Sequence, residues 1–148
     1  MMVTAPPITA KHLYGWKMEQ LLRPYFEDCV GEELTPTQYR FDGCDLTSES
    51  WAVESKARPT YSFRYHTYQD ENTYSEWLVP TCKEKVAESK DLVFFYYWEA
   101  TRKLFFCQYD KELFATIKRG VPHWTTQEHF FIPRELWTEC CVVQTDTQ

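Results

Sequence analysis

The run LVFFYYW at residues 92–98 constrains the fold more than any other stretch of this chain. Apolar side chains occupy both faces of this segment, whereas a strand with one wet face would alternate apolar and polar residues. The run is far too short to cross a bilayer. It therefore predicts a central strand at 91–100 that is covered on both sides, and the rest of the chain must supply both covering layers.

The segments around this strand predict its partners. KLFFCQY at 103–109 follows after Thr101 and Arg102, so the two strands should form a hairpin. Residues 10–30 predict a helix that begins after a candidate N-cap at Thr9 and is kinked or divided by Pro24. Its apolar stripe recurs at spacings of three and four and comprises Tyr14, Met18, Leu21, Leu22, Tyr25 and Cys29.

Between these segments the pattern changes to a period of two, which predicts paired strands at 38–46 and 51–58 joined by the polar turn 47–50. Residues 59–74 are polar and aromatic, and indicate a long loop or flap. Thr81 and Glu84 have the spacing of a capping box, which predicts a short helix to about Ser89.

The last third of the chain predicts a turn at 118–120 and a final strand at 129–137, in which Pro133 starts a helical turn. The order of elements is thus helix, hairpin, helix, hairpin and edge element. The expected fold class is α/β, with a mixed central β-sheet flanked by helices in a single domain that spans residues 1–148.

Composition narrows the possible functions. Hydrophobic residues make up 43% and aromatic residues 18% of the chain, which excludes a disordered protein. The net charge of −6 argues against a protein coated with basic residues that holds nucleic acid nonspecifically. A basic cleft on an acidic body is still compatible with this charge.

The cysteines bear on the compartment. The N-terminus has no basic segment followed by an apolar one, so we expect a soluble cytosolic or nuclear protein whose six cysteines are reduced. Cys140 and Cys141, with His123 and His129 upstream, suggest a zinc module, but their spacing matches no standard ligand pattern. Buried or free thiols are the favoured interpretation.

Charged residues inside the apolar strand at 51–58 need a reason, because burying them is costly. Glu54 and Lys56 lie two apart and therefore share a face. A two- or four-residue turn sets Leu46 opposite Trp51 and brings Asp45 diagonally across from Glu54. An odd-length turn would bring Asp42 opposite Glu54 instead. We expect the even turn, and hence Asp45.

Two carboxylates that converge beside a lysine suit metal-assisted chemistry. Oxygen ligands of this kind hold Mg²⁺, which accepts phosphate oxygens and can lower the pKa of a bound water. The lysine can stabilise a developing oxyanion. The alternative is a surface hairpin whose solvated face carries Asp45, Glu54, Lys56 and Arg58.

The run from Asp45 through the apolar strand to Glu54-Ser55-Lys56 resembles the signature of the PD-(D/E)XK nuclease superfamily, which has the restriction-endonuclease-like fold. The resemblance includes the order of elements and covers most of residues 10 to 110. Two positions depart from the pattern: Cys44 stands where Pro is preferred, and Ser55 where an apolar residue is common.

The resemblance implies hydrolysis of phosphodiester bonds that depends on Mg²⁺ or Mn²⁺. Asp45 and Glu54 would be metal ligands, the Ser55 carbonyl a further ligand, and Lys56 the catalytic lysine. Many members add an acidic residue from the first helix. Glu19 is the match for it in this chain, and Glu27 is the alternative.

Cationic and aromatic residues alternate after the motif. Arg58, Arg64 and His66 are candidate nucleic-acid contacts, interleaved with Tyr61, Phe63, Tyr65 and Tyr68. An aromatic flap packed on the core is the alternative. Lys83, Lys85 and Lys90 are expected to form the solvated face of the second helix.

The sequence therefore favours a small nuclease that acts on DNA, of the size of phage or viral recombination and repair enzymes. Cutting a junction symmetrically would require a homodimer. The competing hypothesis is a nuclease-fold binding or assembly module without catalysis, which the acidic net charge of −6 favours. A zinc module is the third.

Overall fold

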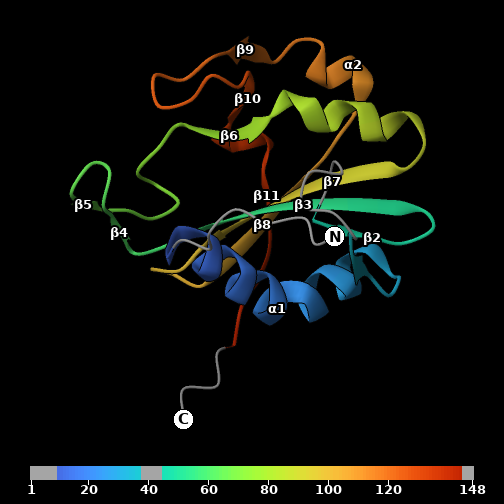
Figure 1. Cartoon of the computed structure of the whole chain (residues 1–148), viewed down its shortest axis with the longest axis horizontal. Coiled ribbons are helices and arrows are strands. Elements are labelled where there is room, and N and C mark those ends of the chain that lie inside the picture. Colours follow the sequence, from blue (N-terminus) through green and yellow to red (C-terminus); the bar gives the residue numbers. More distant parts are fainter. Residues whose placement is uncertain (1–9, 38–44, 145–148) are drawn as a thin grey trace, which may run out of the picture.

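The computed structural model describes residues 10–37 and 45–144, and of residues 10–12 the backbone alone (Figure 1). In chain order the elements are α1 (Ala10–Val30), β1 (Thr35–Pro36), β2 (Leu46–Thr47), β3 (Trp51–Arg58), β4 (Tyr61–Ser62), β5 (Thr67–Tyr68), β6 (Glu76–Pro80), the 3-10 helix η1 (Thr81–Glu88), β7 (Asp91–Trp98), β8 (Lys103–Gln108), α2 (Lys111–Phe114), β9 (Lys118–Gly120), β10 (His129–Pro133), the 3-10 helix η2 (Arg134–Leu136) and β11 (Thr138–Val142).

The main sheet has the strand order β1-β2-β3-β7-β8-β11. Strand β7 pairs in parallel with β3 and antiparallel with β8, so the sheet is mixed, as predicted. Every residue of β7 after Asp91 is buried, which confirms a central strand covered on both sides. The predicted fold class, a mixed sheet between layers that include helices, is confirmed.

Helix α1 covers one face of the main sheet (Figure 1). Leu22 and Phe26 are buried against Val53 of β3 and Phe95 of β7. Pro24 lies inside the helix and does not divide it, which excludes one of the two predicted alternatives. Its ring is exposed, so water can satisfy the carbonyl that loses its partner. The candidate N-cap Thr9 lies outside the described residues.

A second sheet, with the order β6-β10-β9, and the helix η1 cover the opposite face. Trp77 of β6 and Phe130 of β10 pack there against Phe94 and Trp98 of β7. Residues 118–120 form strand β9, so the predicted turn is wrong. Their charges are tolerated at a sheet edge because the Lys118 ammonium and the Arg119 guanidinium lie over the Phe131 and Phe130 rings.

The segment at 81–89 is a 3-10 helix, and the predicted capping box is absent. Pro80 is the N-cap residue and makes no side-chain cap hydrogen bond. The Thr81 hydroxyl donates to the Glu128 carboxylate at 2.9 Å, and Glu84 accepts hydrogen bonds from Arg119. Both side chains that the local spacing assigns to capping therefore bond to distant parts of the chain instead.

The predicted final strand at 129–137 is too long. Strand β10 ends at Pro133, where η2 follows as predicted, and the chain then adds β11 to the edge of the main sheet. Among the described residues, no helix combines the length and apolarity that crossing a membrane requires.

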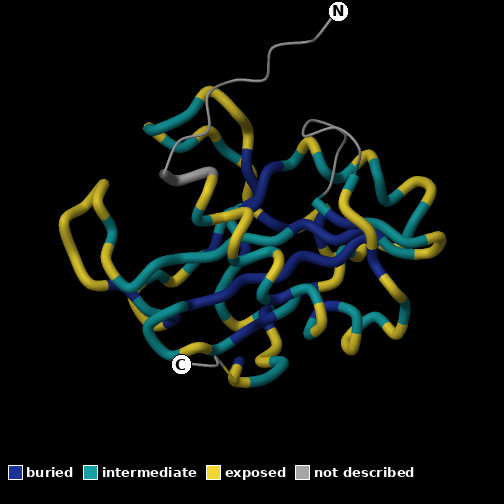
Figure 2. The backbone as a smooth tube through the Cα atoms, turned by 60° about the horizontal axis from the view of Figure 1, so that its bottom comes forward, coloured by how far each residue is buried: buried dark blue, intermediate teal, exposed yellow. Residues whose placement is uncertain are grey.

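Residues 59–74 form the flap, which contains the small antiparallel pair β4–β5. Figure 2 shows its exposed tip standing clear of the buried strands. The base of the flap is fixed, because the Gln69 backbone N–H donates to the Thr60 carbonyl and its side-chain amide to the Pro59 carbonyl, each at 2.8 Å.

Candidate active site

The hairpin that carries the motif has the predicted even register, but its turn is shifted by one residue along the chain. Leu46 lies opposite Val53 and not opposite Trp51. The turn is closed by the Ser48 N–H, which donates to the Trp51 carbonyl at 2.9 Å, and by the Trp51 N–H, which donates to the Ser48 hydroxyl at 3.0 Å. Asp42 lies outside the described residues.

The predicted register places the Asp45 and Glu54 side chains on one face of the hairpin, but the Asp45 carboxylate lies toward the other face. Its carboxylate accepts hydrogen bonds from the Ser55 N–H at 2.9 Å and from the Ser55 hydroxyl at 3.2 Å. Ser55 alternates with Glu54 along β3 and therefore faces α1. Asp45 thus reaches over the edge of β3, near enough for its charge to raise the pKa of Glu54.

Glu54 is buried, with only 4% of the residue exposed, on the face covered by the second sheet. Lys83 Nζ lies 3.5 Å from its Oε1 and Lys56 Nζ lies 3.8 Å from its Oε2. These are ion-pair contacts, and Oε1 has no hydrogen-bond donor within the described part of the chain. Burial, and then the charge of Asp45, raise the pKa of Glu54 to about 7 against the opposing effect of the two lysines.

Glu19 approaches the same place from α1. Burial, and then the charge of Asp45, raise its pKa to about 7. The alternative helix residue, Glu27, accepts a hydrogen bond from the Leu34 N–H at 2.7 Å and lies 3.9 Å from Arg23. Glu27 therefore holds the chain that leaves α1, whereas Glu19 belongs to the carboxylate group around Asp45.

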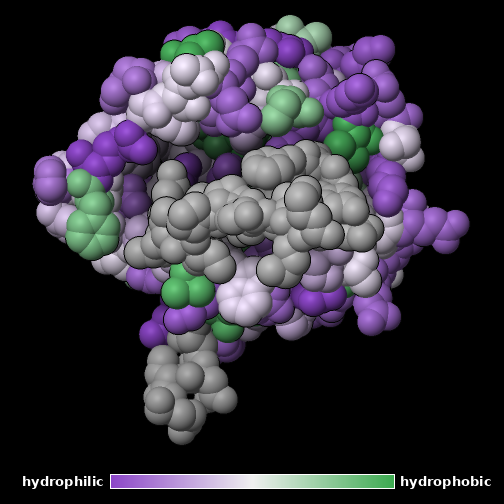
Figure 3. Space-filling view, in the orientation of Figure 1, coloured by the Kyte–Doolittle hydropathy of each residue, from purple (hydrophilic) through white to green (hydrophobic). Residues whose placement is uncertain are grey.

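These residues lie at a cleft of 1480 Å³ between α1, β3, the flap and the loop before β10. Figure 3 shows this face of the molecule hollowed next to the flap. Glu19, Asp45, Ser55 and Lys56 line the cleft, whereas Glu54 lies beneath the lining. The strand edge that carries the motif is thus open to a large ligand.

The three candidate nucleic-acid contacts are separated by the structure. Arg58 lines the cleft and donates to the Tyr96 hydroxyl at 3.0 Å. Arg64 also lines it, with its guanidinium 5.2 Å from the centre of the Trp124 ring. His66 is exposed at the tip of the flap, with φ at 54°, and is not one of the lining residues.

The sequence does not indicate two side chains of this site, Lys83 and His129. Lys83 was assigned to a solvated face, yet its ammonium contacts Glu54, since η1 packs across the end of β3. Lys90 is not solely solvated either, because it donates to the Ser48 carbonyl at 2.7 Å. His129 is buried and lines the cleft, and burial lowers its pKa. No local spacing in the sequence links residues so far apart.

The zinc module, the disfavoured interpretation of Cys140 and Cys141, has no support among the described residues. Within residues 10–37 and 45–144, no three His, Cys, Asp or Glu side chains gather closely enough to hold a metal ion. Cys140 and Cys141 pack on the α1 face of the main sheet, whereas His129 belongs to the second sheet. The five cysteines of the described part are free thiols.

The comparisons with known proteins found little. No family model and no curated protein matches this chain. Among solved structures it is similar to D212, a nuclease from a fusselovirus, with a TM-score of 0.48 and 16% sequence identity, over 93% of this chain and 90% of that one. So remote a likeness does not transfer a function to this chain.

Proposed function

We propose that this chain is a metal-dependent nuclease of the PD-(D/E)XK type that hydrolyses phosphodiester bonds of DNA. The observation that supports it is the group of Glu19, Asp45, Glu54 and Lys56 around one strand edge at a large cleft. Carboxylates whose pKa values are strongly perturbed and that lie beside a cleft are typical of functional sites.

The donor atoms fit Mg²⁺ or Mn²⁺. Asp45 and Glu54 would hold the ion with the Ser55 carbonyl, and Mg²⁺ needs only one or two carboxylates because water and substrate oxygens complete its shell. The Lys83 ammonium lies 3.5 Å from the buried Glu54 Oε1, so a metal ion held by this carboxylate would compete with Lys83. The ion would supply neutralisation of phosphate charge and a bound water of lowered pKa.

Lys56 contributes a mobile positive charge at the cleft. It lines the cleft and its Nζ lies 3.8 Å from Glu54 Oε2, so the carboxylate orients the ammonium without a tight hydrogen bond. In this role Lys56 stabilises the negative charge that grows on the phosphate oxygens. Arg58 and Arg64 supply further positive charge for the backbone of the substrate.

The test is a cleavage assay on linear, circular, single-stranded and branched DNA, and on RNA, with Mg²⁺, Mn²⁺ or EDTA. We expect cleavage of DNA that requires metal and is lost in Glu54→Ala and Lys56→Ala. Lys85→Ala is the matched control, because Lys85 is an exposed lysine of η1 outside the lining of the cleft. Absence of cleavage by the parent under every condition would refute the proposal.

A second candidate is a nuclease-fold module that binds nucleic acid without cutting it. Its support is the burial of Glu54 beneath two lysines and the lack of a three-carboxylate group among the described residues. Binding that persists in the parent without cleavage, and that Glu54→Ala does not weaken, would favour this module. Under the nuclease proposal, cutting both strands of a junction would require a homodimer.

A further inference from the structure

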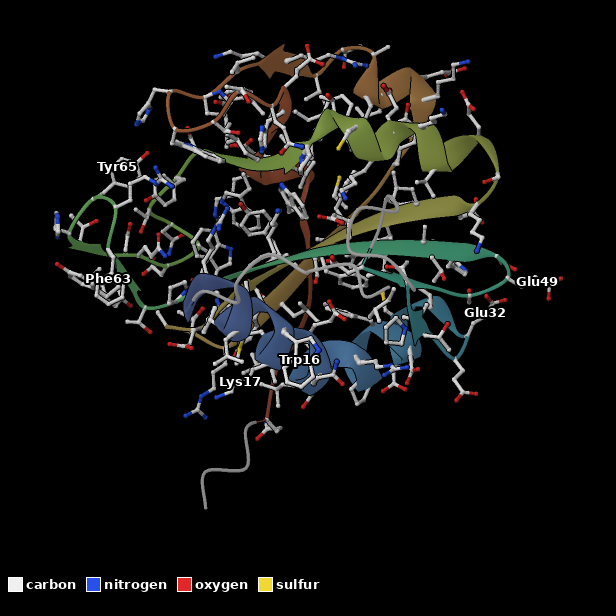
Figure 4. All side chains as sticks on the ribbon, viewed as in Figure 1. Trp16, Lys17, Glu32, Glu49, Phe63 and Tyr65 are labelled. Carbon is white, nitrogen blue, oxygen red and sulfur yellow. The ribbon has the colours of Figure 1, made fainter. Side chains whose placement is uncertain are left out.

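The flap and α1 expose large aromatic side chains at the cleft. Phe63 is 80% exposed and Trp16 is 60% exposed, and both line the cleft together with Tyr61 and Tyr65. Figure 4 shows Phe63 and Tyr65 on the flap and Trp16 on α1. Large apolar side chains that gather at one exposed site indicate a binding surface.

The aromatic rings alternate with cationic groups. The Tyr61 and Phe63 rings meet edge to face with their centres 5.3 Å apart. The Arg64 guanidinium lies over Trp124 of the loop before β10, and Tyr65 lies 6.3 Å from the His123 ring of the same loop. Flap and loop therefore form one continuous wall of the cleft.

The charge of the cleft identifies the ligand class. The whole chain has a net charge of −6, yet Lys56, Arg58 and Arg64 all line the cleft. Glu19, Asp45 and Glu76 line it as well, so the lining as a whole is not positive, but Arg58 and Arg64 lie at the end of β3 and on the flap, beside the exposed rings. Cationic groups that follow a phosphate backbone, beside rings on which bases stack, are the combination that holds single-stranded nucleic acid.

Building on the nuclease function proposed above, we propose that Trp16, Tyr61, Phe63 and Tyr65 hold unpaired nucleotides, so that the substrate carries a single-stranded segment next to the scissile bond. A continuous duplex keeps its base faces stacked inside the helix and offers none to these rings. The fixed base of the flap supports this role, because Gln69 bonds to the Pro59 and Thr60 carbonyls and so presents the rings from a defined position.

The experiment measures binding separately from cleavage. Fluorescence anisotropy of a labelled oligothymidylate, and of the duplex that it forms with oligoadenylate, is recorded in EDTA, where no cleavage occurs. We expect the parent to bind the single strand more tightly than the duplex. Phe63→Ala and Trp16→Ala should each weaken single-strand binding at least about fivefold, since stacking of one base contributes roughly 1–3 kcal/mol.

Tyr68→Ala is the matched control, since Tyr68 is 57% exposed on the same flap but does not line the cleft. It should bind as the parent does. Equal binding of strand and duplex by the parent, no binding of either, or parent-like affinity of both Phe63→Ala and Trp16→Ala would overturn the inference. Circular dichroism of each variant verifies that it is folded.

The two proposals can fail separately. Preferential strand binding that depends on Phe63 and Trp16, without cleavage under any metal condition, would refute the nuclease and leave the stacking surface established. Metal-dependent cleavage by a protein that binds duplex at least as well as single strand would establish the nuclease and overturn the stacking surface.

Discussion

The surroundings of Glu54 act on its pKa in opposite directions. It is buried, it lies near the charge of Asp45, and it contacts two ammonium groups at 3.5 and 3.8 Å. Neither contact is close enough for a strong hydrogen bond. Burial and then the charge of Asp45 raise the pKa of this carboxyl to about 7, so near neutral pH a divalent cation would compete with a proton for it.

The pH dependence of stability follows from this proton. The folded-state pKa of Glu54 is about 7, above its ordinary value of 4.5, so the folded protein binds the proton more tightly than the unfolded chain. In EDTA the free energy of unfolding should fall as pH rises from about 5 to about 8, by at most roughly 3 kcal/mol. Glu54→Gln should remove the contribution of this residue in urea titrations and leave that of Glu19, whose pKa is likewise raised to about 7. A stability that rises over this pH range would contradict the assignment.

The two central residues of the motif should differ in their effects. Lys56→Ala should raise the activation free energy of cleavage by about 3 kcal/mol, as the loss of one oxyanion donor does. It should keep or tighten Mn²⁺ binding. Glu54→Ala should lose Mn²⁺ binding and cleavage together. Calorimetric titration of Mn²⁺ and a cleavage assay on both variants check this. Cleavage by Lys56→Ala at the parent rate would remove Lys56 from the mechanism.

At the scale of elements, long apolar or strongly periodic segments could be predicted from the sequence and short ones could not. The central strand β7 and helix α1 follow from their patterns. Strands β9 and β11 do not, because they lie at sheet edges and contacts with distant residues place them. Likewise, Asp45 was found from the motif, but Lys83 needed the packing of η1 on β3.

The link between the flap and the main sheet can be tested through Glu71. This buried carboxylate accepts a hydrogen bond from the Thr101 hydroxyl at 2.9 Å and lies 3.2 Å from Lys103 Nζ. Glu71→Ala should lower the free energy of unfolding by about 1–3 kcal/mol, because it removes the hydrogen bond of Thr101 and leaves Lys103 with its 3.8 Å contact to Glu139. Urea titration measures the loss, with the exposed Glu88→Ala of η1 as a control that should stay within about 0.5 kcal/mol.

At the scale of the whole molecule, one side chain joins the two sheets. The Trp77 ring of β6 has its centre 4.9 Å from that of Phe105, and 5.3 Å from those of Tyr96 and Trp137. Trp77→Ala should cost about 3–5 kcal/mol, as removal of a large core ring does. Thermal unfolding followed by circular dichroism measures this cost. A loss below about 1 kcal/mol would show that the sheets are held together elsewhere.

The parallel pairing of β3 with β7 determines how early the main sheet can form during synthesis of the chain. Trp51 lies opposite Asp91, so the whole flap, β6 and η1 lie between strands that must meet side by side. Contacts between such distant segments form slowly, over milliseconds to seconds in small domains. On a ribosome, β3 would emerge well before its partner. Glu54 and Lys56 would then reach their folded positions only after β7 has been made, so an incomplete chain would lack the assembled site.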